Sequence, residues 1–489
     1  MKLKNLTIAI LAATLPTTGV FAAALDRSGQ SISSFLQPGN YFEAGLSVLD
    51  PTVEGKESGE TPKPHRDIGD MGDDYYFPSA AIKLQLTDKF SFGLLYDQPF
   101  GADAAYSGQN AFVSSPTDTV LPKDKLDALA AAGTAKVQTY MQSDAAKQAI
   151  GGLMQKGMSQ ADATNAVLAE ASKPLKALAV GLADANASLG KGNTKVEVDT
   201  QNLSMIFGFQ PTKNINLYGG GVYQTVKGNV SLRGTAYSLY NGYDAKIKET
   251  SGAGWLAGAA FQIPDIALKA SVTYRSEIDH DADAIETLTV ESALDRNPAV
   301  LAGLGVTAAQ IAAMKEPGKT KITTPQSVNL DFQTGIMANT IAFANLRWVD
   351  WSSFSIQPHR FGNVSKAIGN LVERPNGFNL VEYSDDQISA TVGVGRKLND
   401  LWSGTVAVGW DSGAGNPVST LGPTEGYWNL GLGVQYSPTP QTFIAGGVKY
   451  FWLGDAKAQT GAQSGEDKYV AEFESNKAIA YGLKIGYKF

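Results

Sequence analysis

The chain has 489 residues, of which 43% are apolar, 18% charged and 9% aromatic, with a formal net charge of −7. This apolar and aromatic content is too high for a disordered chain, and the mean hydropathy of −0.13 is too low for a bundle of membrane helices. The absence of cysteine excludes disulfides and thiolate chemistry, and an acidic balance with three histidines argues against a nucleic-acid partner and a cofactor.

The first segment has the pattern of a targeting signal. Lys2 and Lys4 precede an apolar stretch, and small residues follow around Ala22. This order is typical of a secretory signal peptide, which we expect to cover residues 1–23. Beyond it no run of 18 apolar residues occurs, so the exported chain cannot cross a bilayer as helices. It can still cross as a closed barrel of strands.

From about residue 41 onward, apolar and polar residues alternate with the strand period of two. In the last segment one face is apolar (Ile479, Tyr481, Leu483, Ile485, Tyr487, Phe489), and the other carries small or charged residues (Ala480, Gly482, Lys484, Gly486, Lys488). The same rhythm predicts fourteen strands, near 41–53, 75–86, 90–98, 195–209, 215–230, 251–262, 266–277, 324–336, 340–356, 382–398, 402–412, 425–436, 441–454 and 476–489. An even number is what a closed antiparallel bacterial barrel requires.

The predicted connections alternate between short turns and long loops. Residues 87–89 and 399–400 are short turns, whereas the long loops run from about a dozen residues at 413–424 to nearly a hundred at 99–194. Long and short loops then lie at opposite ends of the sheet. This segregation favours a barrel over a two-sheet sandwich, which does not require it. Because every backbone group in lipid must be paired, we predict an all-β membrane protein, with a 14-stranded antiparallel transmembrane β-barrel over 41–489.

Two long outer loops carry helical insertions, near 123–190 and 297–316. Ser159 with Asp162, and Thr307 with Gln310, have the spacing of a helix N-cap and its third residue. The apolar residues of these helices need cover from one another, from a partner or from an apolar ligand.

Several stretches carry a resemblance to a known family. Residues 24–31, residues 98–103 with Tyr106, and residues 324–327 followed by 348–354 are similar to signatures of the FadL family of outer-membrane long-chain fatty acid transport proteins, which includes TodX-like hydrocarbon channels. The likeness covers essentially the whole exported chain. The terminal Phe489 behind Tyr487 also resembles the signal that the barrel assembly machinery reads.

The resemblance implies a passive channel, not an enzyme, in the bacterial outer membrane, where lipid and lipopolysaccharide surround it. It implies that residues 24–40 form a short N-terminal plug, that loop helices form a hydrophobic outer groove, and that cargo then reaches an interior pocket. A kink in the third strand would open a lateral or periplasmic exit. Family members commonly have a longer N-terminal hatch with an Asn-Pro-Ala element; Asn297, Pro298 and Ala299 match these letters, but they lie in an outer loop.

Charged residues on the inward face are candidates for ligand chemistry. We expect Arg347 and Lys449 to bind a fatty acid carboxylate, because they lie among inward apolar neighbours. These neighbours are Phe343 and Val349 for Arg347, and Phe443 and Phe451 for Lys449. The alternative is that the inward charges form an ion-paired network that fills the barrel.

The third strand is interrupted at Pro99, Phe100 and Gly101. Proline cannot donate a ladder hydrogen bond and glycine allows a bend, so the segment predicts either a strand kink or the end of the strand.

Two other functions stay open at this stage. A general porin or adhesin-like barrel would need a wide polar lumen or polar loops, whereas the inward face here is rich in glycine and aromatic residues. An outer-membrane lipid hydrolase would need a nucleophile with its base, and no Ser-His-Asp or paired-carboxylate motif stands out. The sequence therefore favours a channel for long-chain fatty acids or similar hydrophobic molecules.

Overall fold

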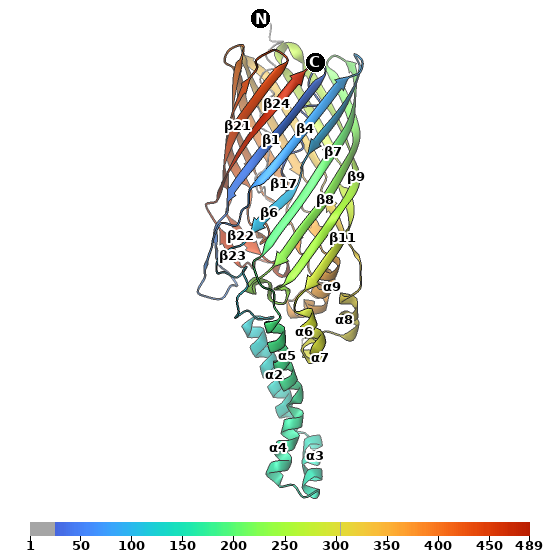
Figure 1. Ribbon diagram of the computed structural model, residues 1–489, viewed down its shortest axis with the longest axis vertical. Helices are drawn as coiled ribbons and strands as arrows, with labels where there is room; N and C mark the ends of the chain where they lie inside the picture. The colour runs from blue at the N-terminus through green and yellow to red at the C-terminus, as the bar shows by residue number, and fades with distance from the viewer. Residues whose placement is uncertain (1–24, 304) are drawn as a thin grey trace.

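The main sheet of the molecule closes on itself as a barrel (Figure 1). The computed structural model describes residues 25–303 and 305–489, so the predicted signal peptide, 1–23, lies outside the described residues. In the described part, the sheet holds 17 strand segments, and three barrel strands are each broken into two, so the chain crosses the barrel fourteen times. Antiparallel pairing of the first strand with the last closes the ring.

Neighbouring barrel strands are antiparallel all round the ring. In chain order the strands and strand segments are β1 (Tyr41–Thr52), β4 (Tyr75–Gln85), β5 (Phe90–Asp97) with β6 (Gly101–Ala105), β7 (Lys195–Thr212), β8 (Ile215–Leu232), β9 (Tyr243–Ile263), β10 (Leu268–Arg275) with β11 (Ile278–Leu288), β12 (Lys319–Thr324) with β13 (Ser327–Met337), β14 (Thr340–Val349), β17 (Gln387–Lys397), β18 (Trp402–Asp411), β20 (Tyr427–Tyr436), β21 (Thr442–Leu453) and β24 (Lys477–Lys488).

The two faces of the barrel follow the alternation in the sequence. On β24, the outward side chains of Tyr481 and Leu483 are 51% and 58% exposed, whereas Ala478 and Ala480 point inward and are buried. An apolar outer face with a filled interior is the arrangement that a barrel needs in lipid. The prediction of a 14-stranded antiparallel barrel is confirmed.

Several strand boundaries differ from the predicted ones. The strand predicted at 251–262 begins earlier, at Tyr243, because β9 has one extra residue opposite Val226 to Gly228 of β8, and its inward alternation changes phase there. The strand predicted at 266–277 continues as β11, which pairs with the early part of β9.

The strand predicted at 340–356 ends at Val349, because the chain turns at Trp351, whose N–H donates to the Val349 carbonyl at 2.9 Å. The strand predicted at 324–336 begins earlier, as β12, and is interrupted at Pro325, which has no N–H for the ladder.

The α-helices lie in the long loops at one end of the barrel, and the C-terminus lies at the other end (Figure 1). Helices α2 to α5 of the first insertion project away from the barrel mouth. The α-helices are α2 (Lys123–Gln142), α3 (Asp144–Gln155), α4 (Gln160–Ala171), α5 (Lys173–Ala187), α6 (Glu291–Arg296), α7 (Pro298–Gly303), α8 (Ala308–Met314) and α9 (His359–Ile368), and the 3-10 helices are η3 (Thr235–Tyr240), η4 (Pro264–Ile266), η5 (Gly369–Leu371) and η6 (Gly461–Gln463). Helix α9 was not predicted. In the described part of the chain, no helix has both the length and the hydropathy to cross a membrane.

Two small sheets belong to the long loops. One pairs β15 (Ser355–Ile356) with β16 (Val381–Glu382), and the other has the order β19 (Val418–Ser419), β22 (Ala456–Gln459), β23 (Ala471–Phe473), β2 (Gly55–Glu57) and β3 (Asp67–Ile68). The buried side chains of the five-stranded sheet join those of the loop helices in one apolar cluster, whereas Ile356 of β15 packs in the cluster of Trp351 and Phe354.

Candidate functional site

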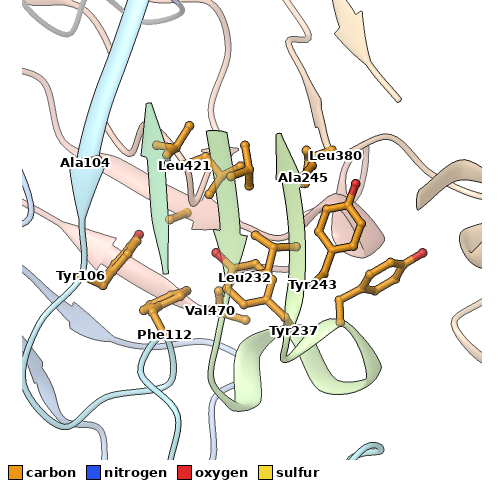
Figure 2. Packing of buried hydrophobic residues seen from close by; sticks show 14 of the residues in the cluster. Ala104, Tyr106, Phe112, Leu232, Tyr237, Tyr243, Ala245, Leu380, Leu421 and Val470 are labelled. Carbon is orange, nitrogen blue, oxygen red and sulfur yellow. The ribbon is translucent and has the colours of Figure 1, made fainter. Parts of the chain in front are cut away.

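An apolar cavity of about 410 Å³, here called the outer pocket, lies among the long loops. Its walls come from the base of α2, from η3, from α9 and from the segment around Leu421. Figure 2 shows the packing around it, with Tyr237 and Leu421 from segments far apart in the sequence. Lys125 of α2 is the one charged residue among the described lining residues. The outer pocket therefore suits an apolar ligand with a single polar end.

Aromatic contacts fix the walls of the outer pocket. Tyr240 stacks on Phe361 with ring centroids 4.4 Å apart, and its hydroxyl donates to the Phe361 carbonyl at 2.9 Å. The Tyr237 hydroxyl donates to the Thr420 hydroxyl at 3.0 Å. Burial raises the pKa of Tyr237 and of Tyr240, so both stay neutral. Because their hydroxyls have partners in the protein, these residues offer a ligand mainly ring surface.

A second cavity of about 200 Å³, here called the luminal pocket, lies inside the barrel. The N-terminal segment, residues 25–40, forms one side of it, and the wall from β13 to β21 forms another. Lys269, Lys449 and Lys484 line it together with Phe343. The lining thus combines cations with an aromatic ring.

The three lysines differ in their partners. Lys484 pairs with Glu43 at 3.3 Å, and the Lys269 ammonium donates to the Leu36 carbonyl at 2.8 Å. Lys449 is 7% exposed and has no hydrogen bond or ion pair within the described residues. Gly431 lies opposite it in the ladder, and a Cβ there would lie 3.1 Å from Cγ of the lysine. The lysine stem therefore packs over the glycine, and its ammonium is available to a ligand.

Arg347, the other predicted carboxylate ligand, is bound to the N-terminal segment instead. Its guanidinium pairs with Asp26 at 2.7 Å and donates to the side-chain oxygens of Gln30 at 3.1 Å and Asn329 at 2.7 Å. It is 3% exposed and does not line the luminal pocket. In this arrangement Arg347 anchors the segment, as the ion-paired alternative expects.

The three aromatic residues that were predicted beside these cations do not share one site. Phe343 lines the luminal pocket. Phe443 lies outside the lining, stacked on Tyr41 with centroids 6.3 Å apart, and Phe451 packs edge-on against Tyr427 at 5.2 Å. Phe443 and Phe451 are buried in packed clusters because they lie four residues to either side of the centre of β21 and so reach different layers of the barrel.

Pro99, Phe100 and Gly101 lie at the break in the third strand, where β5 ends at Asp97 and β6 begins at Gly101. The N-terminal segment pairs with this break. The Arg27 N–H donates to the Pro99 carbonyl at 2.7 Å, and the Gly101 N–H donates to a carbonyl of the segment at 2.9 Å. The Phe100 N–H donates to the Thr200 hydroxyl of β7 at 2.9 Å. The break is thus an ordered part of the barrel wall.

Sequence reasoning missed the aromatic residues of the outer pocket and the pairing of Arg347 with Asp26. Tyr237 and Phe361 come from loops 124 residues apart, so no local period links them. The one available signal was the group of large apolar side chains in loops that have no core of their own.

Comparison with known proteins identifies the family. The sequence profile described as outer membrane protein transport protein (OMPP1/FadL/TodX) matches residues 157–489. The chain belongs to this family. It is therefore a β-barrel channel for hydrophobic compounds in the bacterial outer membrane, and its long loops face the cell exterior, as in other bacterial barrels.

Solved structures share this fold at low identity. A FadL homologue of Pseudomonas aeruginosa has 12% sequence identity and a TM-score of 0.59, over 98% of this chain and 100% of that one. The toluene transporter TodX of P. putida has 10% identity and a TM-score of 0.51, over 93% of this chain and 91% of that one. Comparison with curated protein sequences gives no match. Identities this low establish the fold alone.

Proposed function

We propose that the protein takes up long-chain fatty acids, or amphiphiles with the same chemistry, by passive diffusion. The observation that carries this proposal is Lys449, a buried ammonium without a partner in the described residues, in a luminal pocket that also presents the ring of Phe343. An unpaired charge is costly to bury, so a site that keeps one gains from binding an anion. A neutral hydrocarbon would not supply that anion.

The outer pocket supports the first step of such a route. Its apolar lining can take an acyl chain, and Lys125 at the base of α2 can meet a carboxylate at the rim. From there the cargo would pass down the barrel to the luminal pocket, and would leave through the break at Pro99, Phe100 and Gly101. No energy source is needed, because removal of the cargo inside the cell drives net diffusion.

The alternatives are less well supported. A general porin needs a wide aqueous lumen, whereas the N-terminal segment occupies the lumen here, held by Arg347 and by Lys269. The proposal retains two partners expected from the sequence: lipopolysaccharide around the outward face, and the barrel assembly machinery at Phe489.

The test is oleate binding to purified protein in detergent, with oleyl alcohol as the neutral analogue. Replacing Lys449→Gln should weaken oleate binding about tenfold or more, since a hydrogen bond to a charged group contributes about 1.5–3 kcal/mol. Binding of oleyl alcohol should be unchanged. Lys449→Arg is the matched control, because it keeps a cation at the same position and should keep the oleate affinity.

Equal oleate affinity in the wild type and the Lys449→Gln variant would contradict the carboxylate proposal. If toluene also bound more tightly than oleate, an aromatic hydrocarbon would be the better candidate cargo.

A further inference from the structure

The outer face of the barrel wall is hollowed where two neighbouring strands are interrupted at the same height. The ladder between β10 and β13 ends with Arg275 opposite Ser327, and the ladder between β11 and β12 starts with Ile278 opposite Thr324. Two residues of each strand lie between these pairs and belong to neither ladder. A cavity of about 460 Å³, here called the wall hollow, lies at this point. Its lining includes Ala253, Trp255, Tyr274, Ser276, Glu277 and Gln326.

The wall hollow lies at the border between the apolar and the polar part of the outer face. Val272, on its short-turn side, is apolar and exposed, whereas Asp279, on its long-loop side, is charged and exposed. Tyr274 lies at the same height as Trp348, because both pair with Val328 in neighbouring ladders. Aromatic side chains gather at the interface between membrane and water. Since the long loops face the cell exterior, the hollow lies at the headgroup level of the outer leaflet.

Trp255 forms an apolar platform in the wall hollow. It is 53% exposed, and its ring centroid lies 5.0 Å from that of Tyr274, with the two planes tilted by 49°. In the described part of the chain, its indole N–H has no hydrogen-bond partner, whereas the indole N–H of Trp348 donates to Asp386 at 2.9 Å. An exposed ring of this kind can pack against the C–H face of a sugar, and its N–H can donate to a hydroxyl.

The polar groups around this platform are held in place by the protein itself. The Tyr274 hydroxyl donates to Oε1 of Gln326 at 2.8 Å, and Nε2 of Gln326 donates to Asp350 at 2.8 Å. The backbone N–H of Trp255 donates to the Ser276 hydroxyl at 3.0 Å. Because these side chains are already ordered, binding does not have to immobilise them.

The charge of the lining indicates which polar groups the wall hollow can take. Glu277 is exposed and is the one charged residue among the described lining residues. A carboxylate accepts hydrogen bonds, so it suits hydroxyl and amide groups and repels a phosphate. On the long-loop side, the exposed Asp281 and Asp283 continue this polar surface along β11 toward the loop helices (Figure 1). A longer sugar chain would therefore meet a hydrophilic wall.

We propose that the wall hollow binds the sugar headgroup of an outer-leaflet glycolipid, lipopolysaccharide. One sugar ring packs on Trp255, and its hydroxyl or amide groups donate to Glu277. The acyl chains lie along the apolar outer face on the side of Val272. A phospholipid offers no sugar to the platform. The choice of lipid rests on a partner named in the proposed function, whereas the site does not depend on the cargo, because it lies on the outside of the wall.

The test is lipid binding to purified protein in detergent, counted by native mass spectrometry. The probe is lipid A, whose headgroup is a glucosamine disaccharide. We expect one copy to bind more tightly than phosphatidylethanolamine, and the disaccharide without acyl chains to compete with it. Ala253→Phe places a ring in the hollow, next to Trp255, and should weaken lipid A binding about tenfold or more. Trp255→Ala removes the platform and should weaken binding about threefold to tenfold, as expected for one aromatic contact.

Trp428→Ala is the matched control, because Trp428 is as exposed as Trp255 but lies in an unbroken ladder between Trp410 and Trp452. It should leave lipid A binding unchanged, and all three variants should keep oleate binding. Unchanged lipid A affinity in both the Ala253→Phe and Trp255→Ala variants would overturn the site, and so would an equal loss in Trp428→Ala.

Two further results would overturn the choice of a glycolipid: equal binding of phosphatidylethanolamine and lipid A, or failure of the disaccharide to compete. If the wild type bound lipid A as expected but did not bind oleate, the wall hollow would stand and only the proposed cargo would fall.

Discussion

At the scale of single residues, Glu425 at the outer end of the barrel makes the loop that holds it sensitive to pH. Its carboxyl accepts a hydrogen bond from the Gly415 N–H at 3.2 Å, and its Oε2 has no partner in the described residues. Burial, with the nearby charge of Asp385, raises the pKa of Glu425 from 4.5 to about 7. The folded loop therefore binds this proton more tightly than an unfolded chain does.

Protonation of Glu425 therefore stabilises the folded loop. This contribution is fully present below pH 4.5 and is lost as the pH rises through about 7. Hydrogen exchange at the Gly415 amide, corrected for the intrinsic rate, should show more protection at pH 5 than at pH 8. Glu425→Gln stays neutral and should abolish the difference. A variant with the same pH dependence as the wild type would show that another group is responsible.

At the scale of elements, the N-terminal segment is held in the barrel by the ion pair of Asp26 with Arg347. Both side chains are buried, so removing one partner leaves an uncompensated charge, at a cost of about 3–5 kcal/mol. We expect Arg347→Met alone to loosen the segment and to raise the ion conductance of single barrels in planar bilayers.

The control is the double variant Asp26→Asn with Arg347→Met. It removes both charges together and should restore much of the low conductance of the wild type. If the double variant leaked at least as much as Arg347→Met, the ion pair would not be what holds the segment.

The elements that the sequence predicted are those whose local pattern agrees with their place in the barrel. In regular strands such as β24, apolar and polar residues alternate throughout, so the sequence alone predicts both the strand and which side chains point outward. Helix α9 was missed because its apolar residues, Phe361, Val364 and Ile368, occupy only ten residues in a loop. The break between β12 and β13 was missed because the sequence alternates on both sides of it.

The candidate site was less predictable than the strands. The inward direction of Lys449 follows from its strand alone, but its lack of a partner depends on the whole lumen. Arg347 and Asp26 are 321 residues apart, and Tyr274 and Gln326 come from different crossings of the barrel wall, so neither pairing leaves a local pattern. Such contacts arise only when the sheet closes around the N-terminal segment.

At the scale of the whole molecule, the barrel separates two surfaces with opposite requirements. Its interior holds buried charges that bind the N-terminal segment, whereas its outer wall must present apolar side chains to lipid. On β18 and β20, Val406 and Leu432 lie opposite each other and are each 51% exposed. Both lie near the middle of their strands, where a charge on the outer face would meet hydrocarbon.

Leu432→Lys should therefore lower the free energy of unfolding by about 2–4 kcal/mol, the cost of a lysine at the bilayer midplane. Urea unfolding in liposomes measures this change in the free energy of unfolding. Gln441→Lys adds the same charge in the short turn after β20, where water reaches it, and should change the free energy of unfolding by less than about 0.5 kcal/mol. Equal effects of the two substitutions would mean that the outer face of β20 does not contact hydrocarbon, and would contradict the membrane placement of the barrel.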